Sequence, residues 1–287
     1  MTHAAEAYAF AYFGALIVIA LLECVVPRRR PGDTLVLRWI GNFAVSFVGG
    51  LLARVTFPVA GIGWAIFCDA RGWGLLHAVT VPGWLAIVLT VLVVDLVNYA
   101  QHYALHAVPV LWRLHRMHHT DHEFDFSTGV RFHPFEHLFG TVVSMAAIAL
   151  LGAPPFAVLV SQIVVVTAAF VEHANVRLPE RLDAWLRVVL VTPDMHRVHH
   201  STDVRESTAN FSNTFSFWDR LFGTYLAQPA AGHDGLQFGV TEFAERKHQW
   251  LHWMLVHPFL RPKGMSAQGA ATTPASVADA ASAGPRA

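Results

Sequence analysis

The sequence contains little charge, almost no cysteine and no excess of either charge sign. Charged residues make up 14% of its 287 positions, against roughly a quarter in an average soluble protein, whereas apolar residues make up 54%. Basic and acidic residues are equal in number, 20 of each, so no basic surplus is present to neutralise the phosphates of a nucleic acid. These shortages argue against nucleic-acid binding and favour an integral membrane protein.

Cysteine chemistry is also missing. Cys24 and Cys68 both lie in apolar surroundings and have no Cys-x-x-C spacing. This argues against a disulfide framework, a thiol redox motif and an iron–sulfur site. Any metal must therefore be held by other ligands.

Long apolar runs, by contrast, are plentiful, and we expect an all-α integral membrane bundle. The first run is followed, not preceded, by Arg28–Arg30, which is the reverse of a signal peptide and places its C-terminal end in the cytoplasm. The last two runs are short and separated by Pro154-Pro155, which predicts a helical hairpin, so that the bundle has about four spans with the hairpin last. The apolar runs cover residues 8–26, 39–67, 79–99, 138–153 and 156–171.

Eighteen histidines are present, and three groups of them have helical ligand spacing. His102 and His106 are four residues apart, so both side chains lie on one face of a helix. Thr192-Pro193 before the third group resembles a helix start, with threonine as N-cap and proline at the first position. The other two groups have histidines at i, i+3 and i+4, namely His115, His118, His119 and His196, His199, His200.

Counting crossings from Arg28–Arg30 places residues 95–137 and the chain from His173 onwards on the cytoplasmic side. All three groups and His173 then share one face of the membrane, as a cytosolic, helical, histidine-rich cap.

Nine candidate ligands exceed the roughly six that one ion accepts, so more than one metal is expected. Nearby carboxylates lack ligand spacing and fit better as acceptors that orient imidazole N–H groups: Asp95, Glu136, Glu172, Asp194, Asp203 and Asp219.

Seven further histidines are interpreted as bystanders, because an isolated histidine is more often packed or exposed than a metal ligand. They are His3, His77, His122, His233, His248, His252 and His257.

These motifs together resemble the fatty acid hydroxylase/sterol desaturase superfamily. The similar text begins at Asp95-Leu-Val-Asn-Tyr99 and runs through the three histidine groups, Arg131-Phe-His133-Pro134-Phe-Glu136 and His173-Ala-Asn175. It ends with Asn210-Phe211 and Trp218-Asp219-Arg220-Leu221-Phe222-Gly223-Thr224-Tyr225, and so covers residues 90–226 in order.

The resemblance implies a ligand set for two irons. The nine equivalent histidines here are His102, His106, His115, His118, His119, His173, His196, His199 and His200. Some relatives have a tenth histidine four residues before the one that matches His173, where this chain has Ala169. His133 belongs by resemblance to a structural HPxE turn.

The resemblance also implies the reaction and its partners. It indicates O₂-dependent hydroxylation or desaturation of an unactivated C–H bond in a membrane lipid such as a fatty acyl, sterol-like, ether-lipid or isoprenoid substrate. The cofactors would be two iron ions, cycling between Fe²⁺ and Fe³⁺, with O₂ as co-substrate, and the purified protein could instead contain zinc. No haem-binding His-Pro-Gly-Gly segment, flavin fingerprint or iron–sulfur cysteines are present, so electrons must come from a separate ferredoxin- or cytochrome-type protein with its reductase.

Three alternatives from other classes stay open. A histidine-rich membrane metal-binding or transport protein would be expected to place polar ligands within its spans. A zinc hydrolase would need an open metal position and a general-base carboxylate, and no H-E-x-x-H motif appears. A bis-histidine haem protein would need only facing pairs of histidines.

We therefore predict one membrane-embedded, fatty acid hydroxylase-like domain over residues 1–261, with its motif core at 90–226. Residues 242–260 mix tryptophan, leucine and basic residues and predict an interfacial amphipathic helix. Residues 262–287 are rich in Ala, Ser, Gly and Thr and predict a disordered tail. The Ala/Arg-rich composition suggests a bacterial inner membrane, with the active site on its cytoplasmic side.

Overall fold

The structure, a computed structural model, describes residues 2–261, which are all-helical and contain no β-strand. The five long helices are α1 (Thr2–Val25), α2 (Leu35–Thr56), α5 (Gly83–Ala107), α7 (Pro134–Leu151) and α8 (Pro155–Glu172). All five are long and apolar enough to cross a membrane, whereas the sequence predicts about four spans. The two halves of the predicted hairpin, α7 and α8, each qualify. The tail predicted for 262–287 lies outside the described residues.

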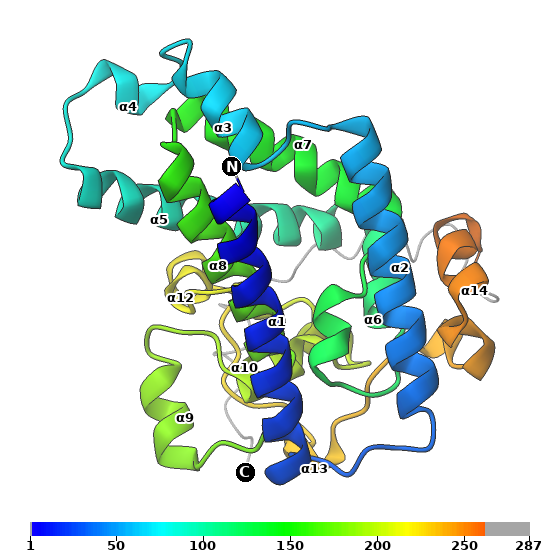
Figure 1. Cartoon of the computed structure of the whole chain (residues 1–287). Helices are drawn as coiled ribbons and strands as arrows, with labels where there is room; N and C mark the ends of the chain where they lie inside the picture. Colours follow the sequence, from blue (N-terminus) through cyan, green and yellow to red (C-terminus); the bar gives the residue numbers. More distant parts are fainter. Residues whose placement is uncertain (1, 262–287) are drawn as a thin grey trace.

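The shorter elements connect and cap this bundle (Figure 1). On the way from α2 to α7 they are α3 (Ile62–Asp69), α4 (Leu75–Ala78), α6 (Pro109–His119) and the 3₁₀ helix η1 (Phe126–Val130). After α8 come α9 (Glu180–Leu186), α10 (Pro193–His199), α11 (Val204–Ser207), α12 (Phe217–Phe222) and α13 (Gly232–Gly235). The last are η2 (Thr241–Phe243), η3 (Arg246–Gln249), α14 (Leu251–Val256) and η4 (His257–Phe259).

Helix α8 is central to the bundle. It packs against α1, α3 and α5, while α7 packs against α2 and α5 (Figure 1). Proline occupies the first position of α6, α7, α8 and α10, where its missing N–H costs no hydrogen bond. One core cluster joins α1, η1 and α8 through Ile19, Phe126 and Phe170, and so ties the first span to the histidine-bearing end of the molecule.

The second predicted span is shorter than its apolar run. Helix α2 ends at Thr56, and the chain turns through Pro58 and Gly61, whose φ of 66° suits glycine. The last part of the run, α3, packs against α7 and α8 instead of continuing α2. Pro58 and Gly61 therefore divide an apolar run that hydropathy alone would predict to be one span.

The outward faces of the long helices are apolar. Phe10 is 83% exposed, Phe47 71% and Leu150 76%. A soluble monomer rarely leaves contiguous apolar surface of this kind in water, but lipid covers it without cost. Together with the five apolar helices, this surface is that of an integral membrane protein.

The C-terminal segment differs from the single amphipathic helix predicted over 242–260. It is divided into η2, η3, α14 and η4, and Trp250 between η3 and α14 has an extended backbone, with φ −84° and ψ 139°. The cause is burial of Gln249, whose amide donates to the Thr120 carbonyl at 2.9 Å and whose oxygen accepts from Arg131 at 3.1 Å. A continuous helix would pull this side chain away from α6.

Candidate metal centre

All nine predicted histidines lie together at one end of the bundle. His102 and His106 come from the end of α5, and His173 directly follows α8. The others lie on or directly after two short helices: His115, His118 and His119 on α6, and His196, His199 and His200 at α10. The predicted start of α10 is confirmed, because the Thr192 hydroxyl accepts a hydrogen bond from the Met195 amide and Pro193 follows it.

The nine side chains form two groups within which the potential ligand atoms lie within 4.8 Å of one another. The first histidine group is His102, His106, His115, His119 and His199, and the second histidine group is His118, His173, His196 and His200. The groups adjoin, since the rings of His119 and His200 stack with centroids 4.6 Å apart. Each of α6 and α10 contributes to both groups, which follows from the i, i+3, i+4 spacing.

The outer nitrogens of four imidazoles are held by fixed acceptors. Nδ1 of His102, His173 and His199 lies 2.7–2.8 Å from a main-chain carbonyl oxygen. Nδ1 of His115 lies 2.7 Å from a carboxylate oxygen of Glu136. A carbonyl oxygen only accepts, so Nδ1 of the first three must carry the proton, which leaves Nε2 as a lone pair in the neutral ring.

The inner nitrogens of these rings converge. His173 Nε2 lies 3.3 Å from Nε2 of His118 and 3.2 Å from that of His196. In the first histidine group, His119 Nε2 lies 3.1 Å from His106 Nε2 and 3.3 Å from His115 Nε2. Nε2 of His102, His199 and His200 is buried with no hydrogen-bond partner among the described residues.

Lone pairs that face one another at these distances repel unless a cation lies between them. The nine histidines therefore fit bound metal ions, and the N–H···O=C arrangement of three of them is the one usual for metal-bound imidazole.

Six of the nine are also in the protonation state that metal binding needs. Burial lowers the pKa of His118, His119, His196 and His200 well below the usual value, and lowers that of His173 and His199 to about 3. They are thus neutral, and able to bind metal, at physiological pH.

Asn210 positions two of the carbonyl acceptors. Its neighbours Ala209 and Phe211 present their oxygens to His199 and His102 respectively. Asn210 itself has φ 55°, the single positive φ of a non-glycine residue within 2–261. Its amide donates to the carbonyls of Met195 and Leu226 at 2.9 and 2.8 Å, which holds this turn in place.

The predicted role of the carboxylates is correct for Glu136 and wrong for four others, while Glu172 lies near two imidazoles with no hydrogen bond to either among the described residues. Glu136 accepts from His115, and Glu172 lies 3.5 Å from His173 Nδ1 and 3.8 Å from His196 Nδ1.

The other four acids are used elsewhere, because unpaired main-chain amides and arginines lie nearer to them than imidazoles do. Asp95 accepts from the amides of Thr214 and Phe215, and Asp219 from those of Phe211 and Ser212. Asp203 caps α11, and Asp194 pairs with Arg28.

A buried polar cluster beneath the α6–η1 loop was not predicted. Arg38 of α2 donates to Asp121 at 2.8 Å and to Asp125 at 2.6 Å, and all three side chains are buried. Burial alone would raise the pKa of Asp121, but the Arg38 guanidinium more than offsets it and holds that pKa well below its usual range. Arg131 lies next to this cluster and donates to the Asn42 oxygen at 2.7 Å. The sequence feature that could have indicated this cluster is Arg38, a charged residue directly before the apolar run of residues 39–67.

The bystander histidines stay apart from the two groups. Within the described residues, none of them joins a set of possible metal ligands. His133 caps α7 by accepting from the Phe135 amide, in line with the predicted turn. Ala169, at the position of the possible tenth ligand, contributes its carbonyl to His173.

Six arginines near the histidine motifs divide into three that are exposed and three that are buried. The six are Arg113, Arg116, Arg131, Arg197, Arg205 and Arg220. Arg116, Arg131 and Arg197 are buried, the first two donating to carbonyls of the C-terminal segment and of α6.

Comparison with known proteins confirms the resemblance. Residues 87–224 match the fatty acid hydroxylase family. The chain is 29% identical over 230 residues to ornithine lipid hydroxylase OlsE of Rhizobium tropici, a match that covers 76% of this chain and 66% of that protein. It is 26% identical over 204 residues to alkylglycerol monooxygenase of Danio rerio, covering 69% and 43%.

A third match covers a smaller part of this chain and of the relative. Alkylglycerol monooxygenase of Homo sapiens is 28% identical over 159 residues, or 55% of this chain and 35% of that protein. The matched segments thus span less than two thirds of each of these three relatives. No solved structure matches the chain.

Proposed function

Because residues 87–224 match the fatty acid hydroxylase family, we propose that the protein is an integral-membrane lipid hydroxylase whose nine clustered histidines hold two iron ions. The observation that carries this proposal is the convergence of nine imidazoles in two adjoining groups, with an unprotonated Nε2 fixed for His102, His173 and His199. The proposal is supported by two relatives, an ornithine lipid hydroxylase and an alkylglycerol monooxygenase.

Bound iron would supply the one-electron and O₂ chemistry that no amino-acid side chain performs. The overall reaction takes one C–H bond of the lipid, O₂, two electrons and two protons, and gives an alcohol and water. Desaturation would instead remove two hydrogens from the lipid and give an alkene and two waters. The two electrons come from a separate donor protein of ferredoxin or cytochrome type with its reductase.

The chain itself contributes position and exclusion of water. The imidazoles of α6 and α10 are buried, so water reaches the reacting carbon less readily than it would at an open surface. Nδ1–H groups tied to carbonyls keep each ring from rotating, and Glu136 does the same for His115. The first histidine group is the less enclosed, since His102 and His106 are only partly buried.

We propose a membrane orientation from the same features. Arg28–Arg30 follow α1 at the end of the bundle where α5 and α8 deliver their histidines, and the positive-inside rule places this end in the cytoplasm. Five crossings then leave both histidine groups on the cytoplasmic side, where soluble electron donors are available. A bacterial inner membrane satisfies this arrangement.

Metal content and O₂ uptake of the detergent-purified full-length protein test the proposal. The expected result is two irons per chain and O₂ consumption with a chemical reductant that rises when membrane lipid is added. Imidazole also binds zinc, so protein purified without iron is expected to contain zinc and to regain O₂ uptake on exchange. Tightly bound zinc with no O₂ uptake after iron reconstitution would contradict the proposal and favour a metal-binding protein or a zinc hydrolase.

A further inference from the structure

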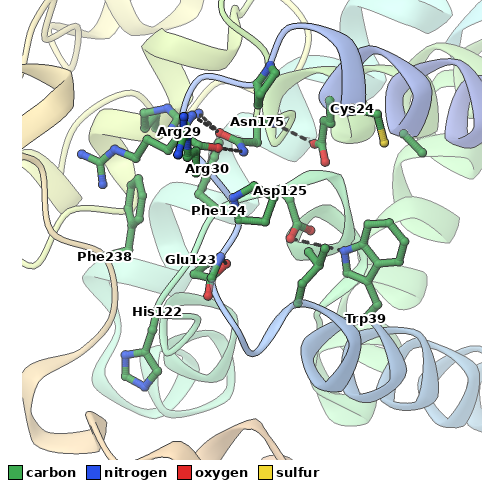
Figure 2. Close-up of a pocket in the computed structure, with 17 residues that line it drawn as sticks. Cys24, Arg29, Arg30, Trp39, His122, Glu123, Phe124, Asp125, Asn175 and Phe238 are labelled. Atoms are coloured by element: carbon green, nitrogen blue, oxygen red, sulfur yellow. Dashed lines mark hydrogen bonds between the residues drawn. The ribbon is translucent and has the colours of Figure 1, made fainter.

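A cavity of about 360 Å³ lies between the ends of α1 and α2, outside both histidine groups. Its size falls within the range, about 300–1,000 Å³, of small-molecule sites. Figure 2 shows its two sides, with Arg29 and Phe238 on one and Trp39 on the other. Neither the fold nor the proposed metal centre requires this space.

One side of the cavity is apolar and borders the membrane. It is lined by Ala20 and Cys24 of α1 and by Leu35 and Trp39 of α2. These helices pack against α8 and α7 respectively, and the loop of residues 26–34 joins them only at this end (Figure 1). The neighbouring surface of α1 is apolar and exposed, so acyl chains can reach the cavity from the bilayer.

The other side is cationic and has unused hydrogen-bond donors. Arg197 is fully buried, and its Nη1 has no hydrogen-bond partner among the described residues. Nε of Arg29 is buried without a partner as well, and no contact partner is found for exposed Arg30 within residues 2–261. The guanidinium of Arg29 stacks on Phe238 at 4.9 Å, and that of Arg197 on Phe124 at 5.0 Å. Two rings therefore hold two arginines in a fixed orientation.

The three acids that line the cavity are already paired. Glu23 accepts from the amides of Phe126 and Asn175 at 2.9 and 2.7 Å. Asp125 accepts from Arg38, and Glu123 from the Gly32 amide at 3.0 Å and the Thr34 hydroxyl at 2.9 Å. Nε of Arg197 lies 3.5 Å from Asp194, which also pairs with Arg28, so the charge of Arg197 is partly neutralised. The hydrogen-bond donors that remain free at the cavity belong to arginines, and their natural complement is an anion with several acceptor oxygens.

A single aromatic ring separates this cavity from the metal centre. Phe124 lines the cavity and also stacks on His173 at 5.6 Å and contacts His200 at 5.1 Å. Arg197 occupies the position directly after His196 on α10, so the cationic side and the second histidine group share one helix. A group bound at Arg197 is consequently held at a fixed place relative to the histidines.

We propose that this cavity binds the anionic headgroup of the lipid substrate, a phosphate or carboxylate, at Arg29, Arg30 and Arg197, while the acyl chains lie along Trp39 and Cys24. This assignment rests on the proposed lipid hydroxylase function and narrows its substrate to anionic lipids. The headgroup charge, and not the chain alone, would then select the substrate.

Protection of Cys24 from alkylation tests the proposal without using catalysis. Cys24 is exposed and lines the cavity, whereas Cys68 is buried and distant from it, so labelling with N-ethylmaleimide reports on the cavity alone. The full-length protein in a neutral maltoside detergent is titrated with dihexanoyl phosphatidate, dihexanoylglycerol or inorganic phosphate. We expect phosphatidate to slow alkylation at a concentration about tenfold lower than dihexanoylglycerol, because charge-assisted hydrogen bonds add affinity.

Variants show which arginine is responsible for the protection by phosphatidate. Arg30→Gln should raise the protecting phosphatidate concentration several-fold, and Arg29→Gln about tenfold. Arg177→Gln, which alters an exposed arginine outside the cavity, should change nothing. The side chain of exposed Arg30 makes no hydrogen bond or ion pair within residues 2–261, so its variant keeps the test valid if Arg29→Gln folds poorly.

The failure of this proposal is distinct from failure of the proposed function. Equal protection by phosphatidate and dihexanoylglycerol, or none by either, would overturn the headgroup site whatever the metal content proves to be. Protection by inorganic phosphate alone at the same concentration would show a free-anion site and would overturn the lipid assignment. Iron content and O₂ uptake are measured separately, so a protein without either can still show selective protection.

Discussion

Two sets of buried histidines in this molecule have opposite character. At the metal centre, nine imidazoles direct Nε2 atoms toward one another, and four of them have Nδ1 fixed by an acceptor. In the C-terminal segment, His248 and His257 are also buried, with ring centroids 5.7 Å apart, yet they pack against Phe243, and no third possible ligand joins them within residues 2–261. Buried rings occur in both sets, so convergence of several ring nitrogens is what distinguishes a metal site.

The largest expected difference between the sets is in metal content. His199→Ala, or His118→Ala in the second histidine group, removes a converging nitrogen and should abolish binding of at least one iron together with activity. His248→Ala removes a ring of equal burial but should retain both irons. Metal analysis of the purified variants checks this, and equal loss from all three would refute the separation into ligands and bystanders.

A smaller effect is expected from the turn that supports the metal centre. Asn210→Ala removes the bonds that hold the carbonyls of Ala209 and Phe211 against His199 and His102. Iron affinity should fall by about 10–100-fold, the usual loss when a partner of a ligating histidine is removed. Competition with a chelator measures the affinity.

Two further variants identify the cause. Asn213→Ala changes a nearby asparagine that bonds only the Thr214 hydroxyl, and it should leave affinity unaltered. Asn210→Gly relieves the positive φ but does not restore the hydrogen bonds. Full affinity in the glycine variant would show that backbone strain, and not the bonds of Asn210, causes the loss.

The smallest effect concerns the C-terminal set and its response to pH. Burial, assisted by Arg116, lowers the pKa of His257 to about 2 from an ordinary value of 6.5. Above pH 6.5 the ring is neutral in both states. Below it the unfolded chain takes up a proton and the folded chain does not, so stability falls as the pH drops from 6.5 towards 2.

His257→Leu removes this titration, and both ring nitrogens lack hydrogen-bond partners within residues 2–261, so no bond is lost. The stability of the variant relative to the parent should rise by about 2 kcal/mol between pH 7 and pH 5. Thermal unfolding at the two pH values gives this difference, and because the metal centre is the same in both proteins its own titration cancels. A difference independent of pH would mean that His257 is protonated in the folded state.

Much of the metal centre could be predicted because helical spacing is local. The i, i+3, i+4 pattern and the start of α10 at Thr192 need only neighbouring residues, and both are seen in the structure. The carbonyl partners could not be predicted, since Phe211 lies 109 positions from His102 and a main-chain oxygen leaves no mark in the sequence. The same reason explains the wrong assignment of Asp95 and Asp219, whose partners are main-chain amides.

The fold was predictable to the extent that hydropathy decides it. Five apolar runs became five long helices, but Pro58 and Gly61 set the end of α2 where hydropathy continued. The C-terminal helix failed for a tertiary reason, because the amphipathic pattern of 242–260 does not reveal that Gln249 must reach Thr120 and Arg131. The Arg38–Asp121 pair shows the same limit, since its partners are 83 positions apart.

Main-chain acceptors at Ala169, Ala209 and Phe211 make the imidazole orientations depend on where the chain runs and not on which side chains it bears. Every residue type offers a carbonyl, so substitutions at these positions can leave the oxygens in place. Insertion or deletion of a single residue between His200 and Asn210 would shift two acceptors at once. Residue-by-residue comparison ignores the length of that loop. A change in its length is nevertheless the change that this metal centre should tolerate least.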